Sequence, residues 1–310
     1  MSKAKKKRSQ APVALVYFIT LLVFMAVFGF IAFQLLKKVT IFDKNNDDDE
    51  LKSDRSFSIM MARLDSTGSL MDIGLFKFMP DDERILIVPL PGRTVNDSTG
   101  VLMSEVYQAG GIRSLENAVE NTLGISVDYY ITVEESAFET VFDIIGGVVF
   151  TADEELYRLT DNDAEDISYQ AGIPVELTGI QARVLLDTKI FSNGYQGNLN
   201  LQCSVLQQLV NSAFRQANLT KNSLDNIYDK LVGTGETNYT DAIFREHKQI
   251  IIEMLDKKLK PGSLFKPDGE WRDEERYVLA ATFKNSLQEI YGIPTETEKA
   301  AMNAESTDEE

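Results

Sequence analysis

The sequence contains an uncharged run of 26 residues, from Ala11 to Leu36, and such a run is too apolar to remain exposed to water. At a rise of about 1.5 Å per residue, a helix of that length crosses a hydrocarbon layer of roughly 30 Å. The run is longer than the apolar core of an ordinary signal peptide, and the FQLLKK at its end has no small-x-small cleavage pattern. We therefore expect residues 11–36 to be a retained transmembrane helix.

Basic residues flank this run unequally. The preceding MSKAKKKRSQ carries five Lys/Arg, whereas Lys37, Lys38 and Lys44 follow the run. The flank richer in Lys and Arg tends to stay in the cytoplasm. We expect residues 1–10 to be a basic cytoplasmic tail, with a single-pass anchor in the cell membrane and the remaining chain outside the cell.

Two further stretches are too acidic and too poor in apolar residues to pack into a core. Residues 37–55 contain FDKNNDDDELKSD, and residues 294–310 end in AESTDEE. Such compositions are typical of solvated linkers and disordered tails. The expected organisation is thus an acidic linker at 37–55, a folded domain at 56–293 and a disordered acidic tail at 294–310.

Charge and composition exclude several classes of function. Residues 39–310 hold 24 Lys/Arg against 48 Asp/Glu, so this part of the chain should repel nucleic acid, and we expect no nucleic-acid partner. The single cysteine, Cys203, excludes a disulfide within the chain and a cysteine-rich zinc site. The single histidine, His247, excludes any site built on two histidines.

The pattern of residues 56–293 mixes strands with helices and predicts a mixed α/β fold, in which helices cover a central sheet. Apolar and β-branched runs indicate strands at 57–64, 70–79, 84–90 and 128–133, and VVFTADEE indicates another from 148. Helical spacing and caps indicate helices at 114–124, 136–147, 178–186, 197–217, 223–231, 240–259 and 273–291.

One stretch resembles a known family. ISVDYYITVEESAFETVFDIIGGVVFTADEEL, from Ile125 to Leu156, is similar to the central signature of the LytR–CpsA–Psr cell-envelope proteins, and LTGIQA, from Leu177 to Ala182, resembles a helix start of that family. The resemblance implies a central β-sheet flanked by helices on both faces. It also implies a role in cell-wall biogenesis: holding a polyprenyl-linked glycopolymer outside the membrane and passing it, through its phosphate, to peptidoglycan.

That transfer requires cations around a pyrophosphate, usually arginines and a metal ion held by carboxylates. Matched without gaps, the family's six basic positions retain only Lys189, while Arg93 and the acid Asp72 each stand one residue late. Asp187 occupies a position where the family has an arginine. The resemblance therefore implies a chain with the fold of the family and a degraded phosphotransferase centre.

We interpret the chain as an accessory or binding member of the family, a pseudoenzyme. One alternative is an active phosphotransferase with a rearranged site; a scaffold that binds a partner envelope protein and no ligand is the other. In a rearranged site, Arg93, Asp72 and Lys189 would be catalytic, Arg183 and Asp187 would bind ligand, and Asp72 would hold Mg²⁺ together with Asp187. Arg93 is equally compatible with an exposed turn, and Arg183, within QARVLL, fits a solvated helix face better than a site.

Overall fold

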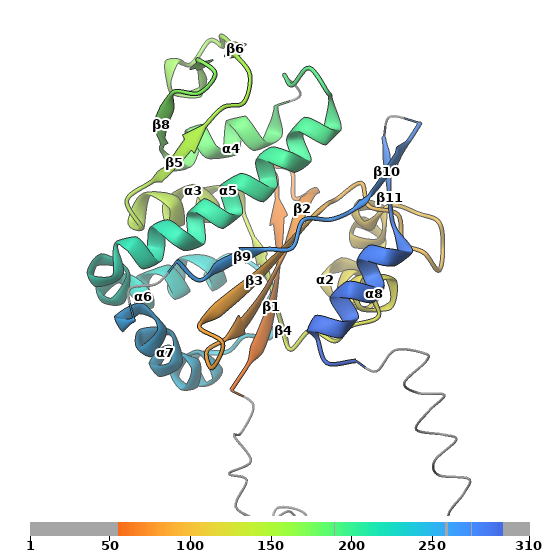
Figure 1. Cartoon of the computed structure of the whole chain (residues 1–310), viewed down its shortest axis with the longest axis vertical. Helices are drawn as coiled ribbons and strands as arrows, with labels where there is room; N and C mark the ends of the chain where they lie inside the picture. The colour runs from red at the N-terminus through yellow and green to blue at the C-terminus, as the bar shows by residue number, and fades with distance from the viewer. Residues whose placement is uncertain (1–54, 189, 258–259, 274, 294–310) are drawn as a thin grey trace, which may run out of the picture. The chain divides into compact units, whose positions relative to one another are not determined.

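The structure, a computed structural model, describes residues 55–188, 190–257, 260–273 and 275–293 (Figure 1). The predicted transmembrane helix at 11–36, most of the linker and the tail at 294–310 lie outside these residues. Within the described ranges, no helix combines the length and the apolar character needed to cross a membrane.

A five-stranded mixed sheet forms the centre of the described domain, in the order β4-β1-β2-β3-β9. Two tight connections make β1, β2 and β3 an antiparallel meander, while β4 and β9 run parallel to their neighbours at the two edges. The strands are β1 (Phe57–Leu64), β2 (Leu70–Met79), β3 (Arg84–Pro91), β4 (Tyr129–Val133) and β9 (Gly262–Leu264). The four strands predicted before residue 134 are thus confirmed to within one residue at each end.

Alternating side chains of these strands feed two separate cores, because successive residues of a strand point to opposite faces. Phe57 and Ile59 of β1 belong to one core, and Met60 and Ala62 belong to the other. Both faces of the sheet are therefore apolar and both must be covered.

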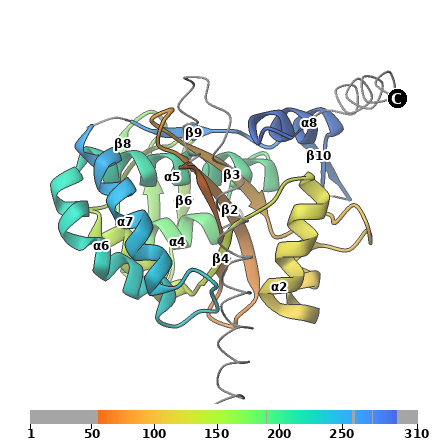
Figure 2. The same ribbon diagram turned by 90° about the horizontal axis from the view of Figure 1, so that it is seen from below.

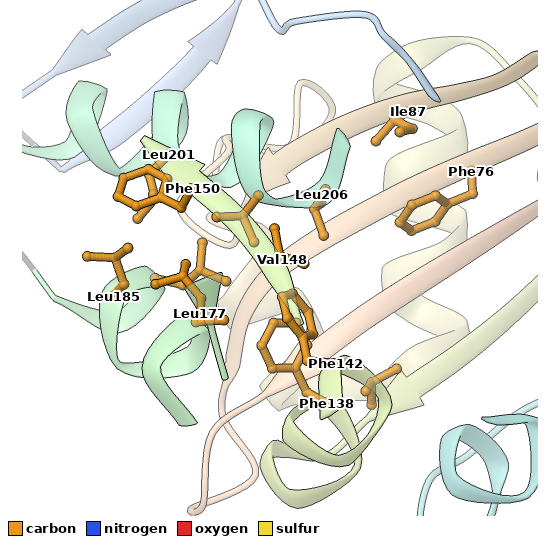
Figure 3. Packing of buried hydrophobic residues seen from close by; sticks show 14 of the residues in the cluster. Phe76, Ile87, Phe138, Phe142, Val148, Phe150, Leu177, Leu185, Leu201 and Leu206 are labelled. Carbon is orange, nitrogen blue, oxygen red and sulfur yellow. The ribbon is translucent and has the colours of Figure 1, made fainter. Parts of the chain in front are cut away.

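Helices cover both faces, as Figures 1 and 2 show, which confirms the predicted mixed α/β class. On one face lie α2 (Met103–Leu123) and α8 (Ala281–Ile290). The other face carries a larger group of helices: α3 (Glu135–Ile144), α4 (Gly179–Asp187), α5 (Tyr195–Arg215), α6 (Ala217–Val232) and α7 (Asp241–Asp256). Phe138 and Phe142 of α3 and Leu206 of α5 point into the core on this second face (Figure 3).

Three small two-stranded sheets complete the fold, and of their strands only β5 was predicted. They pair β5 (Val148–Thr151) with β8 (Pro174–Leu177), β6 (Leu156–Arg158) with β7 (Ile167–Tyr169), and β10 (Gly269–Arg272) with β11 (Arg276–Leu279). A 3-10 turn, η1 (Asp163–Glu165), precedes β7. The helix predicted from 273 is wrong in its first part, because β11 occupies this region and α8 begins only at Ala281.

α2 joins two helical segments across a kink at Gly111; the predicted helix from Ser114 lies in the second segment, and the first segment was not predicted. The helix begins at Met103, eleven residues before the predicted Ser114, and Glu105 accepts a hydrogen bond from the Leu102 backbone N–H at 2.9 Å. Gly111, with φ 67° and ψ −165°, breaks the helical geometry in its middle. Only glycine adopts such a conformation readily, so Gly111 permits the kink between the two segments.

Candidate functional site

Arg63 is the charged residue around which the site is built. It lies near the end of β1 on the same face as Phe57 and Ile59, where its side chain is only 6% exposed. Asp72 of β2 is its direct cross-strand partner. The strand register becomes irregular immediately after Arg63, a feature that re-aims side chains near the ends of strands.

The Arg63 guanidinium donates hydrogen bonds to two carboxylates that are far apart in the sequence. Its Nε donates to Asp72 Oδ2 at 2.9 Å, and its Nη2 donates to the same oxygen at 2.5 Å. Its Nη1 donates to Asp187 Oδ1, at the end of α4, at 2.8 Å. The Phe138 ring of α3 lies 5.3 Å from the guanidinium carbon, within the range of a cation–π contact.

Burial and neighbouring charges shift the pKa values of Arg63 and Asp187. Burial alone lowers the pKa of Arg63, but the charges of Asp72 and Asp187 outweigh it and leave that pKa raised. Burial raises the pKa of Asp187, and the neighbouring guanidinium offsets only part of this effect. Arg63 is therefore permanently charged.

A polar pocket of about 390 Å³ opens beside this cluster, at the end of the sheet. We define it by its charged and aromatic lining: Arg63, Asp72, Arg93, Glu105, Asp187, Tyr195 and Trp271. Among the described lining residues, two arginines face three carboxylates, which leaves a net charge of −1. An anionic ligand thus meets a pocket whose positive charge is already neutralised.

Arg93 follows β3 and lines the polar pocket, next to two aromatic rings. Its guanidinium carbon lies 4.7 Å from the Tyr195 ring centroid, and its Nη1 lies 3.5 Å from Glu275 Oε2. Tyr195 stacks on Trp271 with centroids 5.2 Å apart. The side chain of Arg93 is 34% exposed, so it is better solvated than that of Arg63, which is 6% exposed.

Two amide side chains of α5 carry buried polar atoms without a protein partner. Gln202 is 4% exposed, and neither its Nε2 nor the Oδ1 of Asn198 has a hydrogen-bond partner. Both residues line the polar pocket. Because buried polar atoms are nearly always satisfied, the Gln202 Nε2 donor and the Asn198 Oδ1 acceptor are available to hydrogen-bond water or the hydroxyl groups of a ligand.

An apolar cavity of about 230 Å³ lies on the other side of Arg63 and Asp72. Its walls come from the sheet and from helices α3, α5, α6 and α7, including Phe138 and Leu206 (Figure 3). Arg63 and Asp72 line both the apolar cavity and the polar pocket. α3 lines the apolar cavity, whereas α4 contributes Leu186 and Asp187 to the polar pocket.

The remaining predicted residues lie elsewhere. Arg183 of α4 forms ion pairs with Glu135 at 3.2 Å, Glu139 at 2.7 Å and Glu165 at 3.1 Å, and it lines neither the apolar cavity nor the polar pocket. It connects α3, α4 and the η1 turn. Lys189 lies outside the described residues.

A Mg²⁺ ion does not fit between Asp72 and Asp187 in this arrangement. One oxygen of each carboxylate already accepts hydrogen bonds from Arg63, whose guanidinium fills the space between them. In the part of the chain that the structure describes, no cluster of three or more His, Cys, Asp or Glu could hold a metal ion. The structure therefore brings the predicted pair together, but around an arginine.

Sequence reasoning missed Arg63 as a site residue. The signal is present in the strand FSIMMARL, whose alternation puts one arginine on a face that is otherwise apolar. A charge on a buried face requires partners, because an unpaired one is costly. That argument indicates a buried ion pair without identifying the partners.

Comparisons with known proteins agree with this fold. The sequence model of the LytR_cpsA_psr family matches residues 42–289. The polyisoprenyl-teichoic acid–peptidoglycan teichoic acid transferase TagV of Bacillus subtilis (strain 168) is 26% identical over 211 residues, covering 68% of this chain and 51% of the relative. This chain thus spans about half the length of that relative.

Solved structures show the same architecture at lower identity. A protein of Eubacterium siraeum DSM 15702 has a TM-score of 0.68 at 16% identity, covering 80% of this chain and 98% of that chain. The crystal structure of Bacillus subtilis TagV has a TM-score of 0.60 at 21% identity, covering 78% of this chain and 100% of that chain. With a family match over most of its length, this chain belongs to the LytR–CpsA–Psr family.

Proposed function

We propose that this protein binds a polyprenyl-linked glycan of the cell envelope and holds it without transferring it. In this proposal residues 11–36 anchor the chain in the cell membrane, and the domain at 56–293 lies on the extracytoplasmic side. The lipid tail occupies the apolar cavity, and its phosphate and sugar occupy the polar pocket.

The observation that carries the proposal is that the apolar cavity and the polar pocket meet at Arg63 and Asp72, which line both. A dry cavity of about 150 Å³ accommodates benzene, with six carbons, so a cavity of about 230 Å³ holds roughly nine. Nine carbons correspond to about two isoprene units. The two cavities together suit an amphipathic ligand whose apolar chain ends at a polar group.

Charge supports binding without transfer. Breaking a bond to phosphorus in a pyrophosphate develops negative charge, which transferases stabilise with arginines and metal ions. Here Arg63 is already paired with two carboxylates, and Arg93 lies beside Glu275. Negative charge that develops on a phosphate would be repelled, because the described lining residues of the polar pocket carry a net charge of −1.

The class of ligand follows from the relatives. TagV is named as a transferase of teichoic acid from a polyisoprenyl carrier to peptidoglycan. The apolar cavity of this chain is compatible with such a carrier. Which glycan it carries is not part of the proposal.

An active transferase is the second candidate, favoured by Arg63 itself. This arginine lies beside Asp72 and keeps two N–H groups that it does not donate to the carboxylates, since a guanidinium has five. With Arg93 and Lys189 it could form a rearranged cationic set. A third reading, a partner-binding scaffold, is favoured by the exposed apolar side chains of Tyr157, Leu159 and Ile173 near β6 and β8.

A transfer assay separates the first two candidates. The purified full chain is incubated with a fluorescent polyprenyl-pyrophosphate glycan, peptidoglycan and Mg²⁺, and both retained lipid and glycan transferred to peptidoglycan are measured. The proposal expects retention of the lipid and no transfer. Transfer that Arg93→Ala abolishes would establish the active alternative, and failure to retain the lipid would leave only the scaffold.

A further inference from the structure

The Arg63 side chain occupies the space in which two converging carboxylates would otherwise bind a cation. Asp72 and Asp187 approach it from β2 and α4, and each gives it an oxygen at hydrogen-bond distance. Mg²⁺ is commonly held in proteins by one or two carboxylates together with waters and substrate phosphates. The two aspartates thus form a minimal divalent-cation site, filled by a guanidinium.

We propose that Arg63 is a built-in substitute for a divalent metal ion, so that the head-group pocket of this protein works without metal. The inference deepens the proposed function, because it concerns the polar pocket of the same site. The guanidinium is fixed by three hydrogen bonds and by the Phe138 ring, and its side chain is 6% exposed. A metal ion would have to displace it.

The substitution changes what the pocket binds. A divalent ion would balance both carboxylates, whereas one guanidinium leaves this cluster with a net charge of −1. The pocket consequently favours ligands with few negative charges and many hydroxyls, such as the sugar part of a glycolipid or a single phosphate. The unpartnered Gln202 Nε2 supplies a neutral donor for such groups.

The test uses Mn²⁺ alone, so its result is independent of whether any lipid binds. Binding of Mn²⁺ to the purified full chain is measured by electron paramagnetic resonance for wild type, Arg63→Met, Arg63→Lys and Arg63→Met/Asp72→Asn. We expect Arg63→Met to bind about one Mn²⁺ more than wild type, through the two freed carboxylates. The extra ion should be absent from Arg63→Lys, which keeps the charge, and from the double variant.

A second comparison covers the case in which Arg63→Met does not fold. Wild type and Asp187→Asn should bind the same number of Mn²⁺ ions, because Asp187 is closed to metal by Arg63. If Asp187→Asn loses one ion relative to wild type, the aspartates already bind metal and the inference is overturned. A folded Arg63→Met that gains no ion overturns it as well.

Discussion

Removing Arg63 should destabilise the fold far more than removing an arginine from a surface ion pair. Arg63→Met keeps much of the side-chain volume but leaves two carboxylates facing each other at 15% and 23% exposure. Breaking a buried ion pair from one side typically costs about 3–5 kcal/mol, because the remaining charge is uncompensated. The partial exposure of both acids places the expected loss near the lower end, about 3 kcal/mol.

The assay is urea unfolding at pH 7 with EDTA, followed by the fluorescence of Trp271, the single tryptophan of the chain. The control is Arg245→Met, whose ion pair with Asp241 is 73% and 61% exposed, so that its loss should change the free energy of unfolding little. Adding Asp72→Asn to Arg63→Met should recover part of the loss, since it removes one uncompensated charge. Equal losses for Arg63→Met and Arg245→Met, or no recovery, would refute the reasoning.

Two more perturbations test other parts of the fold. Burial lowers the pKa of His247 below its ordinary 6.5 and outweighs the opposite effect of Glu246 and Asp128. The imidazole of the unfolded chain therefore binds a proton more readily than that of the folded chain. The free energy of unfolding should consequently fall as the pH drops below 6.5. His247→Phe, which keeps the ring stacked on Phe57, should flatten that pH dependence of the midpoint in urea; an unchanged slope would contradict the assignment. Gly179→Ala would place a Cβ 2.0 Å from the Glu139 carbonyl oxygen, so α4 should move away from α3. This should lower the free energy of unfolding by about 1–3 kcal/mol. An unchanged free energy of unfolding would show that the backbone relieves the contact without cost.

Much of the fold could be predicted because strands β1, β2 and β3 are local and strongly apolar. Their apolar runs and the intervening turn residues define the strand boundaries without reference to the rest of the chain. The kink in α2 and the β10–β11 hairpin were not predictable in the same way. Gly111 resembles a helix boundary, and β11 is a short strand whose pairing depends on a partner outside the predicted helix.

Only part of the candidate site could be predicted, because the residues that contact one another in it are distant in sequence. Asp72 and Asp187 were identified from the family pattern, but nothing local indicates that both approach Arg63, which is 124 residues before Asp187. The family pattern matched to the sequence also assigned no role to Arg63. Cross-strand register places Arg63 opposite Asp72, and the packing of α4 adds the second acid.

The most direct test of the account is equilibrium binding of a radiolabelled polyprenyl phosphate to the purified full chain, compared with a cavity-filling variant. Ala213→Trp places a large ring in the apolar cavity, and Ala242→Trp on the exposed side of α7 is the control. Displacing about four carbons at about 0.8 kcal/mol each costs about 3.2 kcal/mol, which predicts roughly 200-fold weaker binding for Ala213→Trp. The account predicts that loss with unchanged binding by Ala242→Trp; equal binding by wild type and Ala213→Trp would contradict it.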